Sequence, residues 1–297
     1  MKNPYFGRIL TAMITPFAAD GSLHLEATKQ LVEWLIAHGT DALVVTGSTG
    51  EAATMTMEEK KAIWATVVKQ VNGRIPVIAG TGSNNTANSV ETTKIADEIG
   101  VDGFLIVGPY YNKPTQEGYY QHLKAISECT AKPIILYNVP GRTAANIPPT
   151  TVARIAKDFK NVVAIKEAAG NVAQVAELFR LLPADFTIYS GDDGLLLPFA
   201  SVGATGVVSV LSNIGGEILQ DLMTAYESGD VKKAAEINKR MVPLANSLFI
   251  ETNPIPVKAA VTLVTGIDAG APRLPLTPMT EGALAKMKAI LAENGLI

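Results

Sequence analysis

VVAIKEA, at residues 162–168, joins an apolar run rich in β-branched residues to a single lysine, Lys166. A short, continuous apolar run is typical of a strand that is buried on both faces of a parallel sheet. Burial of the lysine at its end would lower the pKa of the ammonium group toward the neutral amine, a nucleophile that forms Schiff bases with ketones. The alternative is a lysine whose side chain extends to solvent at the strand end.

Similar runs recur on both sides of this stretch. The other strands are expected at Ile9–Ile14, Ala42–Val45, Ile75–Ala79, Gly103–Val107, Ile134–Tyr137, Phe186–Tyr189 and Gly206–Val210. Helical spacing of apolar residues separates them at Leu25–Ala37, Met57–Val71, Thr86–Ile99, Gln116–Glu128, Thr150–Phe159 and Val172–Leu182. This alternation indicates an α/β fold and predicts a (β/α)8 TIM barrel, with the active site at the carboxyl ends of the strands.

A doubly wound open sheet is the competing architecture. It would use fewer strands and usually carries a glycine-rich phosphate loop. The turns at 47–50 and 80–82 contain glycines, but neither has the spacing of a dinucleotide-binding fingerprint.

After the last expected strand only helical periodicity remains, at Ile218–Glu227, Val231–Ile250, Pro256–Val264 and Glu281–Glu293. We therefore expect a barrel catalytic domain at residues 1–224. A helical C-terminal region at 225–297 is expected to extend it and to pack against the barrel.

The composition is that of a soluble globular protein. The 297 residues are 47% hydrophobic and 18% charged, with a formal net charge of -3. Basic residues form no cluster larger than a pair, so no nucleic-acid partner is expected. Cys129 is the only cysteine, which excludes an intramolecular disulfide and fits a reducing compartment. The N-terminal residues are a poor secretory signal, and we expect a cytoplasmic protein.

Membrane and metal-dependent proteins are also disfavoured. Residues 194–211 carry no charge, but Pro198 and glycines interrupt them, so a short helix, a turn and a buried strand are expected instead of a membrane helix. The histidines, His24, His38 and His122, are scattered and form no cluster with metal-ligand spacing. We expect no metal ion and no other cofactor.

Polar residues follow several of the expected strands. Ser48 and Thr49 lie on a glycine-flanked turn that can hold a carboxylate, although an ordinary helix cap is the simpler interpretation. Tyr137 and Arg142, taken singly, are typical of a core and a surface residue. Because these groups and Lys166 follow different strands of one barrel, we expect them to meet in one site. There the lysine is the nucleophile, the hydroxyls move protons and the arginine binds a carboxylate.

Seven motifs occur in order along the chain. They are GSTGE at 47–51, IPVIAGTG at 75–82, PYYNKP at 109–114, YNVPGRT at 137–143, IKE at 165–167, SGDD at 190–193 and NPIPVK at 253–258. By these motifs the sequence resembles the dihydrodipicolinate synthase and N-acetylneuraminate lyase superfamily, and within it the dihydrodipicolinate synthases. The resemblance extends from Gly7 to Leu296.

The resemblance implies a lyase that condenses pyruvate with L-aspartate 4-semialdehyde by class I aldolase-type chemistry, in diaminopimelate and lysine biosynthesis. Lys166 would form the Schiff base with pyruvate, and Tyr137 would donate and accept protons. Ser48 would connect Tyr137 to Tyr111, which would enter the site from a neighbouring subunit across a dimer interface.

The resemblance also implies the substrate-binding groups and the assembly. Thr49 and the main chain at Val208 would hold pyruvate, and Arg142 would bind the carboxylate of the aldehyde. Gly191 would belong to the substrate-binding set. The usual assembly in the family is a homotetramer, built as a dimer of dimers.

Ser48 departs from the family pattern, which usually has threonine at this position. Serine keeps the hydroxyl but lacks the methyl group that restricts χ1, so a looser geometry is expected.

Neuraminate lyases also have a GSTGE turn, so the alternative is a lyase for N-acetylneuraminate or a 2-keto-3-deoxy sugar acid. Arg142 favours the synthase branch. A third possibility, an inactive barrel that serves as a ligand-binding regulator, is disfavoured by the intact Lys166 and Tyr137.

A second departure concerns regulation. Lysine-inhibited members of the family use a histidine and a glutamate at the dimer interface. Here Met57 and Lys60 stand at positions that are often histidine, and Asn88 replaces the glutamate. Without a carboxylate for the ligand's ammonium group, and with a like charge nearby, we expect weak or absent inhibition by lysine.

Overall fold

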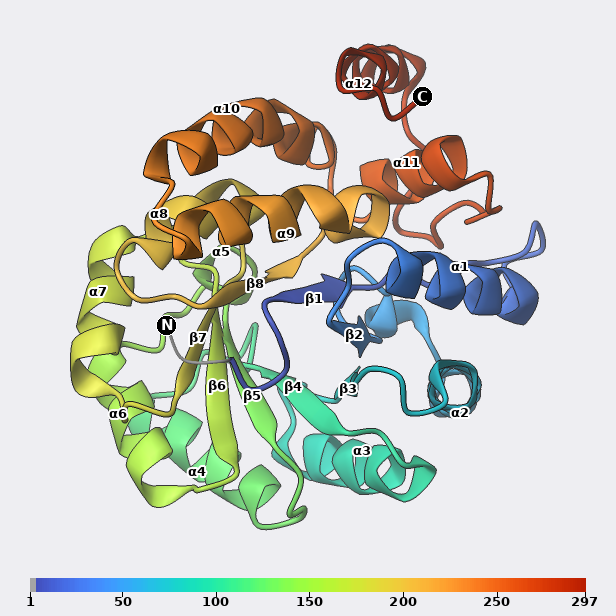
Figure 1. The fold of residues 1–297 in the computed structure, drawn as a ribbon. Coiled ribbons are helices and arrows are strands. Elements are labelled where there is room, and N and C mark those ends of the chain that lie inside the picture. Colours follow the sequence, from blue (N-terminus) through green and yellow to red (C-terminus); the bar gives the residue numbers. More distant parts are fainter. Residues whose placement is uncertain (1–3) are drawn as a thin grey trace.

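The strands of this protein close into a barrel. The computed structural model describes residues 4–297, and in it eight parallel strands pair in chain order, with β8 returning to β1 (Figure 1). They are β1 Ile9–Ala12, β2 Ala42–Val45, β3 Val77–Gly80, β4 Gly103–Val107, β5 Ile134–Asn138, β6 Val162–Glu167, β7 Thr187–Ser190 and β8 Gly206–Ser209. The predicted (β/α)8 barrel is confirmed. The first three residues of the predicted 1–224 region, part of the N-terminal segment judged a poor signal, lie outside the described residues.

Helices surround the barrel on the outside (Figure 1). They are α1 Leu25–Ala37, α2 Met57–Val71, α3 Thr86–Ile99, α4 Gln116–Ser127, α5 Pro140–Thr143, α6 Pro149–Asp158, α7 Val172–Leu181, α8 Leu196–Ala200, α9 Ser212–Glu227, α10 Val231–Ser247, α11 Ile255–Thr265 and α12 Glu281–Glu293, with short 3-10 turns at Ala52–Thr54 and Asp193–Leu195. The helix α2 begins with a capping box, in which Thr56 and Glu59 satisfy each other's backbone N–H groups.

The C-terminal helices pack on α9 and on one another. Both α10 and α11 contact α9, and α12 contacts α10 and α11 (orange to red in Figure 1). A helical extension is therefore present, as predicted. The predicted division between residues 224 and 225 falls inside α9, and the two-region description stays a prediction.

Two apolar layers cover the two faces of the barrel strands. One fills the barrel interior and includes Leu10, Ile78 and Ala164, and the other lies between the strands and the helices. Residue pairing across the sheet places Tyr137 of β5 and Tyr189 of β7 directly beside Lys166 of β6. The barrel register thus places Tyr137, whose ring lies 4.4 Å from Lys166 Nζ, on the strand next to the lysine.

The first strand is shorter than the predicted Ile9–Ile14. The Ile14 N–H donates to the side chain of Asn213 (3.2 Å) instead of to a neighbouring strand, so the ladder ends before it. The side-chain amide of Asn213 also donates to Ala12 O (2.9 Å), which fixes the chain where it leaves the barrel.

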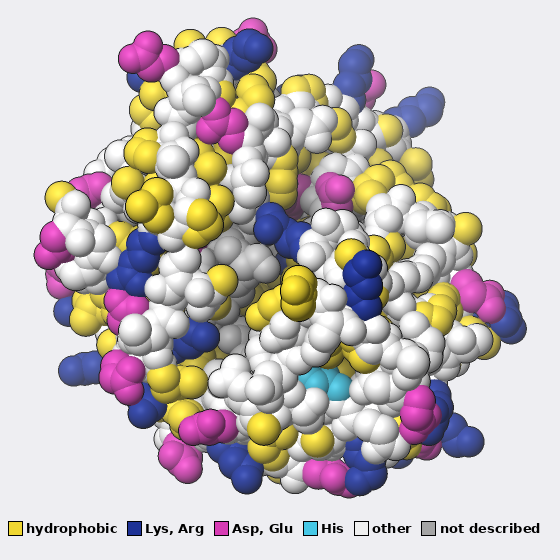
Figure 2. Space-filling model, turned by 180° about the vertical axis from the view of Figure 1, so that it is seen from behind, with side chains coloured by type: hydrophobic (Ala, Val, Ile, Leu, Met, Phe, Trp, Pro, Cys, Tyr) yellow, Lys and Arg dark blue, Asp and Glu magenta, His cyan; other side chains and the backbone are white. Residues whose placement is uncertain are grey.

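The uncharged stretch 194–211 forms a short helix, a turn and a strand, as predicted, with α8 and β8 as its regular elements. Within residues 4–297 no helix is long and apolar enough to cross a membrane. Figure 2 shows acidic and basic side chains interspersed on the face opposite to that of Figure 1, where basic groups form no continuous area.

Candidate active site

A cavity of about 270 Å³ lies at the carboxyl ends of the strands. Its wall consists of Ala12, Val44, Gly47, Ser48, Thr49, Leu105, Tyr137, Val139, Arg142, Lys166, Ala168, Gly191, Asp192, Val210, Ala245, Asn246, Phe249 and Asn253. The structure therefore brings together most of the predicted site residues, namely Ser48, Thr49, Tyr137, Arg142, Lys166 and Gly191. Three wall residues, Ala245, Asn246 and Phe249, come from α10 and the turn after it, so the C-terminal region borders the cavity.

Lys166 is buried at the end of β6, with 6% of its surface exposed, and does not extend to solvent. Its Nζ lies 4.4 Å from the centroid of the Tyr137 ring. Burial lowers the pKa of Lys166 to about 8; the carboxylate of Asp193 acts against this shift, and the guanidinium of Arg142 adds to it. About a tenth of this amine is therefore neutral and nucleophilic at pH 7, far more than for an exposed lysine.

Tyr137 is similarly enclosed, with 7% of its surface exposed. Burial raises the pKa of Tyr137 to about 12, and the positive charge of Arg142 acts in the opposite direction. The phenol is therefore protonated at neutral pH. It can donate a proton to a group bound beside Lys166, and it needs a second group to exchange that proton with solvent.

Ser48 and Thr49 lie on residues 47–50, which we call the hydroxyl turn. Ser48 is exposed at the cavity, whereas Thr49 is 5% exposed. The side chain of Asn253 donates from Nδ2 to Thr49 Oγ1 (3.0 Å). One hydroxyl of the turn is thus accessible and the other is held by the C-terminal region.

The hydroxyl turn is flanked by two residues with left-handed backbone conformation, Thr46 (φ 54°) and Glu51 (φ 55°). Non-glycine residues persist in this conformation when their surroundings fix them. Trp64 Nε1 donates to Thr46 Oγ1 (2.8 Å), and the Glu51 carboxylate accepts from Lys258 Nζ and from the N–H of Arg273, both at 2.9 Å. Buried side chains therefore fix both ends of the turn.

Two predicted site residues do not line this cavity. Tyr111 is 90% exposed, with φ 71°, in the loop between β4 and α4. Val208 is 1% exposed in the barrel interior, and Val210 lines the cavity after the end of β8. Neither placement tests the role that the resemblance implies, because Tyr111 is expected to act in a neighbouring subunit and Val208 through its main chain.

Sequence reasoning missed the role of Asp193, which it treated only as part of the loop after the seventh strand. The carboxylate is 2% exposed, and its Oδ2 accepts from the N–H groups of Val210 (3.0 Å) and Leu211 (2.9 Å). Burial raises the pKa of Asp193, and these hydrogen bonds act against the rise. Two aspartates, Asp192 and Asp193, are adjacent in the sequence, and nothing in the sequence indicates which side chain faces inward.

Glu167 was also missed. It is fully buried behind the strands, and Asn138 Nδ2 donates to both of its carboxylate oxygens (3.0 and 3.1 Å). The N–H of Ala169 donates to the same carboxylate (2.7 Å). This contact joins β5 to β6 at the residues that directly follow Tyr137 and Lys166, so it stiffens the pair of strands that carries both.

The electrostatic environment of Lys166 predicts a pH dependence. The amine is protonated below about pH 8 and neutral above it. We therefore expect the rate of Schiff-base formation with pyruvate to rise through this range and to level off above it. In the variant Asp193→Asn the midpoint should move to lower pH, because the carboxylate that favours the ammonium form is gone. Cyanoborohydride trapping at graded pH measures both midpoints, and an unchanged midpoint in the variant would contradict the electrostatic link.

Among residues 4–297, no group of three or more His, Cys, Asp or Glu side chains is placed to hold a metal ion. The chemistry available at the cavity is that of the amine, the phenol, the hydroxyls and the guanidinium. A parallel barrel with a buried, partly neutral lysine beside a phenol, and with an arginine at the same cavity, has the groups that Schiff-base chemistry needs.

Comparison with known proteins specifies the family. Residues 5–294 match the model of the dihydrodipicolinate synthetase family, and the chain belongs to this family. It is 54% identical to 4-hydroxy-tetrahydrodipicolinate synthase 1 of Halalkalibacterium halodurans over 274 residues, which cover 92% of each protein.

Solved structures agree with this assignment. A dihydrodipicolinate synthase from Bacillus anthracis superposes with a TM-score of 0.95 at 47% identity, covering 97% of this chain and 98% of that one. A synthase from Cyanidioschyzon merolae, crystallised with lysine bound, superposes with a TM-score of 0.97 at 40% identity, covering 99% and 100%.

Proposed function

We propose that this protein condenses pyruvate with L-aspartate 4-semialdehyde to 4-hydroxy-tetrahydrodipicolinate, through a Schiff base at Lys166. The observation that carries the proposal is the buried Lys166, with its pKa lowered to about 8, inside the cavity of a chain 54% identical to a synthase of this name. The product belongs to lysine and diaminopimelate biosynthesis.

The chemistry begins when the neutral amine of Lys166 adds to the C2 carbonyl of pyruvate. Loss of water gives an iminium ion, and loss of a methyl proton gives an enamine. The terminal carbon of the enamine forms a carbon–carbon bond with the aldehyde carbon, whose oxygen takes up a proton. The amine of the semialdehyde then attacks C2, which closes the ring and releases Lys166.

Tyr137 supplies the proton transfers in this scheme. Its ring lies against Lys166, and its high pKa keeps the phenol as a donor. Ser48, which is accessible at the cavity, connects it to Tyr111 of a neighbouring subunit. The 90% exposure of Tyr111 supports this part of the proposal, because an aromatic ring held clear of its own chain is available to a partner. The assembly that we propose is a homotetramer, built as a dimer of dimers, in the cytoplasm.

Arg142 distinguishes the substrates. It lines the cavity and is exposed there, so its guanidinium can bind the carboxylate of the incoming aldehyde. Replacing it with alanine should raise the KM for aspartate semialdehyde by about tenfold or more, since a hydrogen bond between charged groups is lost. Trapping of pyruvate at Lys166 should persist.

A coupled assay with pyruvate and aspartate semialdehyde, run on the native protein and on Arg142→Ala, tests both parts. Cleavage of N-acetylneuraminate or of a 2-keto-3-deoxy sugar acid, with no turnover of the semialdehyde, would instead support the alternative branch. An equal loss of affinity for both substrates in the variant would show that Arg142 does not act on the aldehyde alone.

A further inference from the structure

The C-terminal region contacts the hydroxyl turn from outside the barrel. Asn253, just before α11, donates from Nδ2 to Thr49 Oγ1 across 204 positions of sequence. Lys258, within α11, donates to Glu51, which directly follows the turn, across 207 positions. Both side chains are buried, with exposed fractions of 6% for Asn253 and 1% for Lys258. The turn is therefore fixed by residues that belong to no strand of the barrel.

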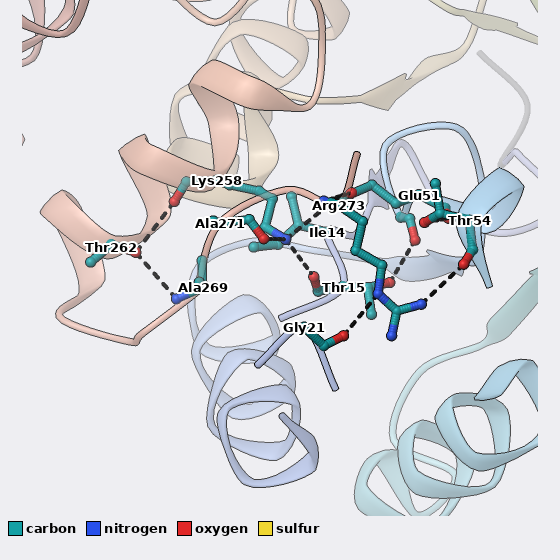
Figure 3. A network of polar contacts seen from close by, with 12 residues as sticks. Ile14, Thr15, Gly21, Glu51, Thr54, Lys258, Thr262, Ala269, Ala271 and Arg273 are labelled. Carbon is teal, nitrogen blue, oxygen red and sulfur yellow. Dashed lines mark hydrogen bonds and ion pairs between the residues drawn. The ribbon is translucent and has the colours of Figure 1, made fainter. Parts of the chain in front are cut away.

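Lys258 binds the carboxylate of Glu51, the residue that directly follows the turn (Figure 3). Its Nζ donates to Glu51 Oε1 (2.9 Å), Thr15 O (3.1 Å) and Ala271 O (3.2 Å), which uses all three N–H groups of the ammonium. The N–H of Arg273 donates to the other oxygen of Glu51 (2.9 Å). Glu51 is thereby fixed in its left-handed conformation, and the turn before it cannot shift without breaking a buried ion pair.

Asn253 sets the direction of one hydroxyl. A hydroxyl group has one hydrogen and two acceptor lone pairs, and the amide of Asn253 occupies one lone pair of Thr49. Within residues 4–297, Thr49 Oγ1 has no protein acceptor for its own hydrogen, and Asn253 Oδ1 is buried without a partner. Within the described residues, Thr49 is thus the hydrogen-bond partner of the Asn253 side-chain amide. The hydroxyl hydrogen is left for a ligand in the cavity that Thr49 lines.

We propose that Asn253 is a positioning residue that makes Thr49 a hydrogen-bond donor to the carboxylate of pyruvate. The pair Glu51–Lys258 holds the turn where this donation is possible. The inference rests on the proposed function, since it concerns the binding of pyruvate. The main-chain oxygen of Asn253 also accepts from Arg142 Nη2 (3.5 Å), so the same residue contacts the group proposed for the second carboxylate.

A double-mutant cycle between positions 49 and 253 tests the inference. Asn253→Asp keeps the shape of the side chain but removes the donor, so Thr49 would donate to the new carboxylate and turn its lone pairs toward pyruvate. The same substitution is made in Thr49→Val, which has no hydroxyl to orient. Steady-state kinetics on the full-length protein give the KM for pyruvate and kcat in all four proteins.

With Thr49 present, Asn253→Asp should raise the KM for pyruvate by about tenfold or more, with kcat at saturating pyruvate changed much less. In Thr49→Val the same substitution should change the KM by less than about twofold, because coupled residues are non-additive. An equal rise in both backgrounds would overturn the inference, since the effect would then come from charge or packing and not from the hydroxyl.

Asn253→Ala provides a second measurement, and it replaces the first if Asn253→Asp does not fold. Here the hydroxyl is released without being reversed, so the KM should rise only a few-fold, and not at all in Thr49→Val. A larger rise for Asn253→Ala than for Asn253→Asp would point to packing and overturn the inference. Failure of the native protein to form a reducible adduct with pyruvate would instead refute the proposed function itself.

Discussion

Replacing Lys166 with arginine should lower kcat/KM by a factor on the order of 10⁴ or more, because no other group at the cavity can form the covalent intermediate. Lys166 is the only lysine in the wall of this cavity, as far as residues 4–297 show. Arginine keeps the positive charge, but its guanidinium stays protonated and is not a nucleophile. The measurement is the coupled assay with pyruvate and aspartate semialdehyde.

Lys160→Arg is the matched control. Lys160 lies shortly before the same strand, and its side chain is exposed and, among the described residues 4–297, donates to Lys157 O (2.8 Å). This variant should keep the native rate within about twofold, because surface substitutions of this kind change little. Substantial turnover in Lys166→Arg would show that the reaction does not proceed through this amine.

Breaking the buried pair of Lys258 and Glu51 should have the largest effect on stability. Their side chains are 0% and 1% exposed. Lys258→Met keeps much of the apolar stem but leaves the buried Glu51 carboxylate without its ion-pair partner, which costs about 3–5 kcal/mol. Two carbonyl groups, of Thr15 and Ala271, lose their donor as well. Denaturant unfolding at a fixed protein concentration measures the loss.

Two comparisons isolate the cause. Adding Glu51→Gln to Lys258→Met should recover part of the stability, since the unpaired charge is then removed. Lys29→Met breaks an exposed pair with Glu26, whose side chains are 45% and 65% exposed, and should cost less than about 1 kcal/mol. A loss as small in Lys258→Met as in Lys29→Met would contradict the role of the buried pair.

The sequence was sufficient to place the candidate groups at the strand ends, where six of them line one cavity. An apolar run followed by a lysine predicted β6, and the structure extends that strand to Val162–Glu167, so that Lys166 lies within its last pairings. The periodic signal works here because both faces of a parallel barrel strand are buried and the run is continuous. Candidate groups on separate strands could be assigned to one cavity because the carboxyl ends of all strands meet at the same end of the barrel.

The contacts that hold the site could not be predicted in the same way. Glu51 and Lys258 lie 207 positions apart, and a glutamate or a lysine taken alone is typical of the surface. The resemblance placed both in motifs of the family but did not show that they touch. Asp193 and Glu167 were passed over for a similar reason, because burial of a carboxylate depends on donors from other elements, such as the N–H groups of Val210 and Leu211.

The most direct test of the central proposal is covalent. The native protein is incubated with pyruvate, reduced with borohydride, digested and mapped by mass spectrometry. We predict one adduct per chain, with the mass of a reduced pyruvate, on the peptide that contains Lys166 and on no other. Absence of an adduct, or an adduct on a different lysine, would contradict the assignment of Lys166 as the Schiff-base residue.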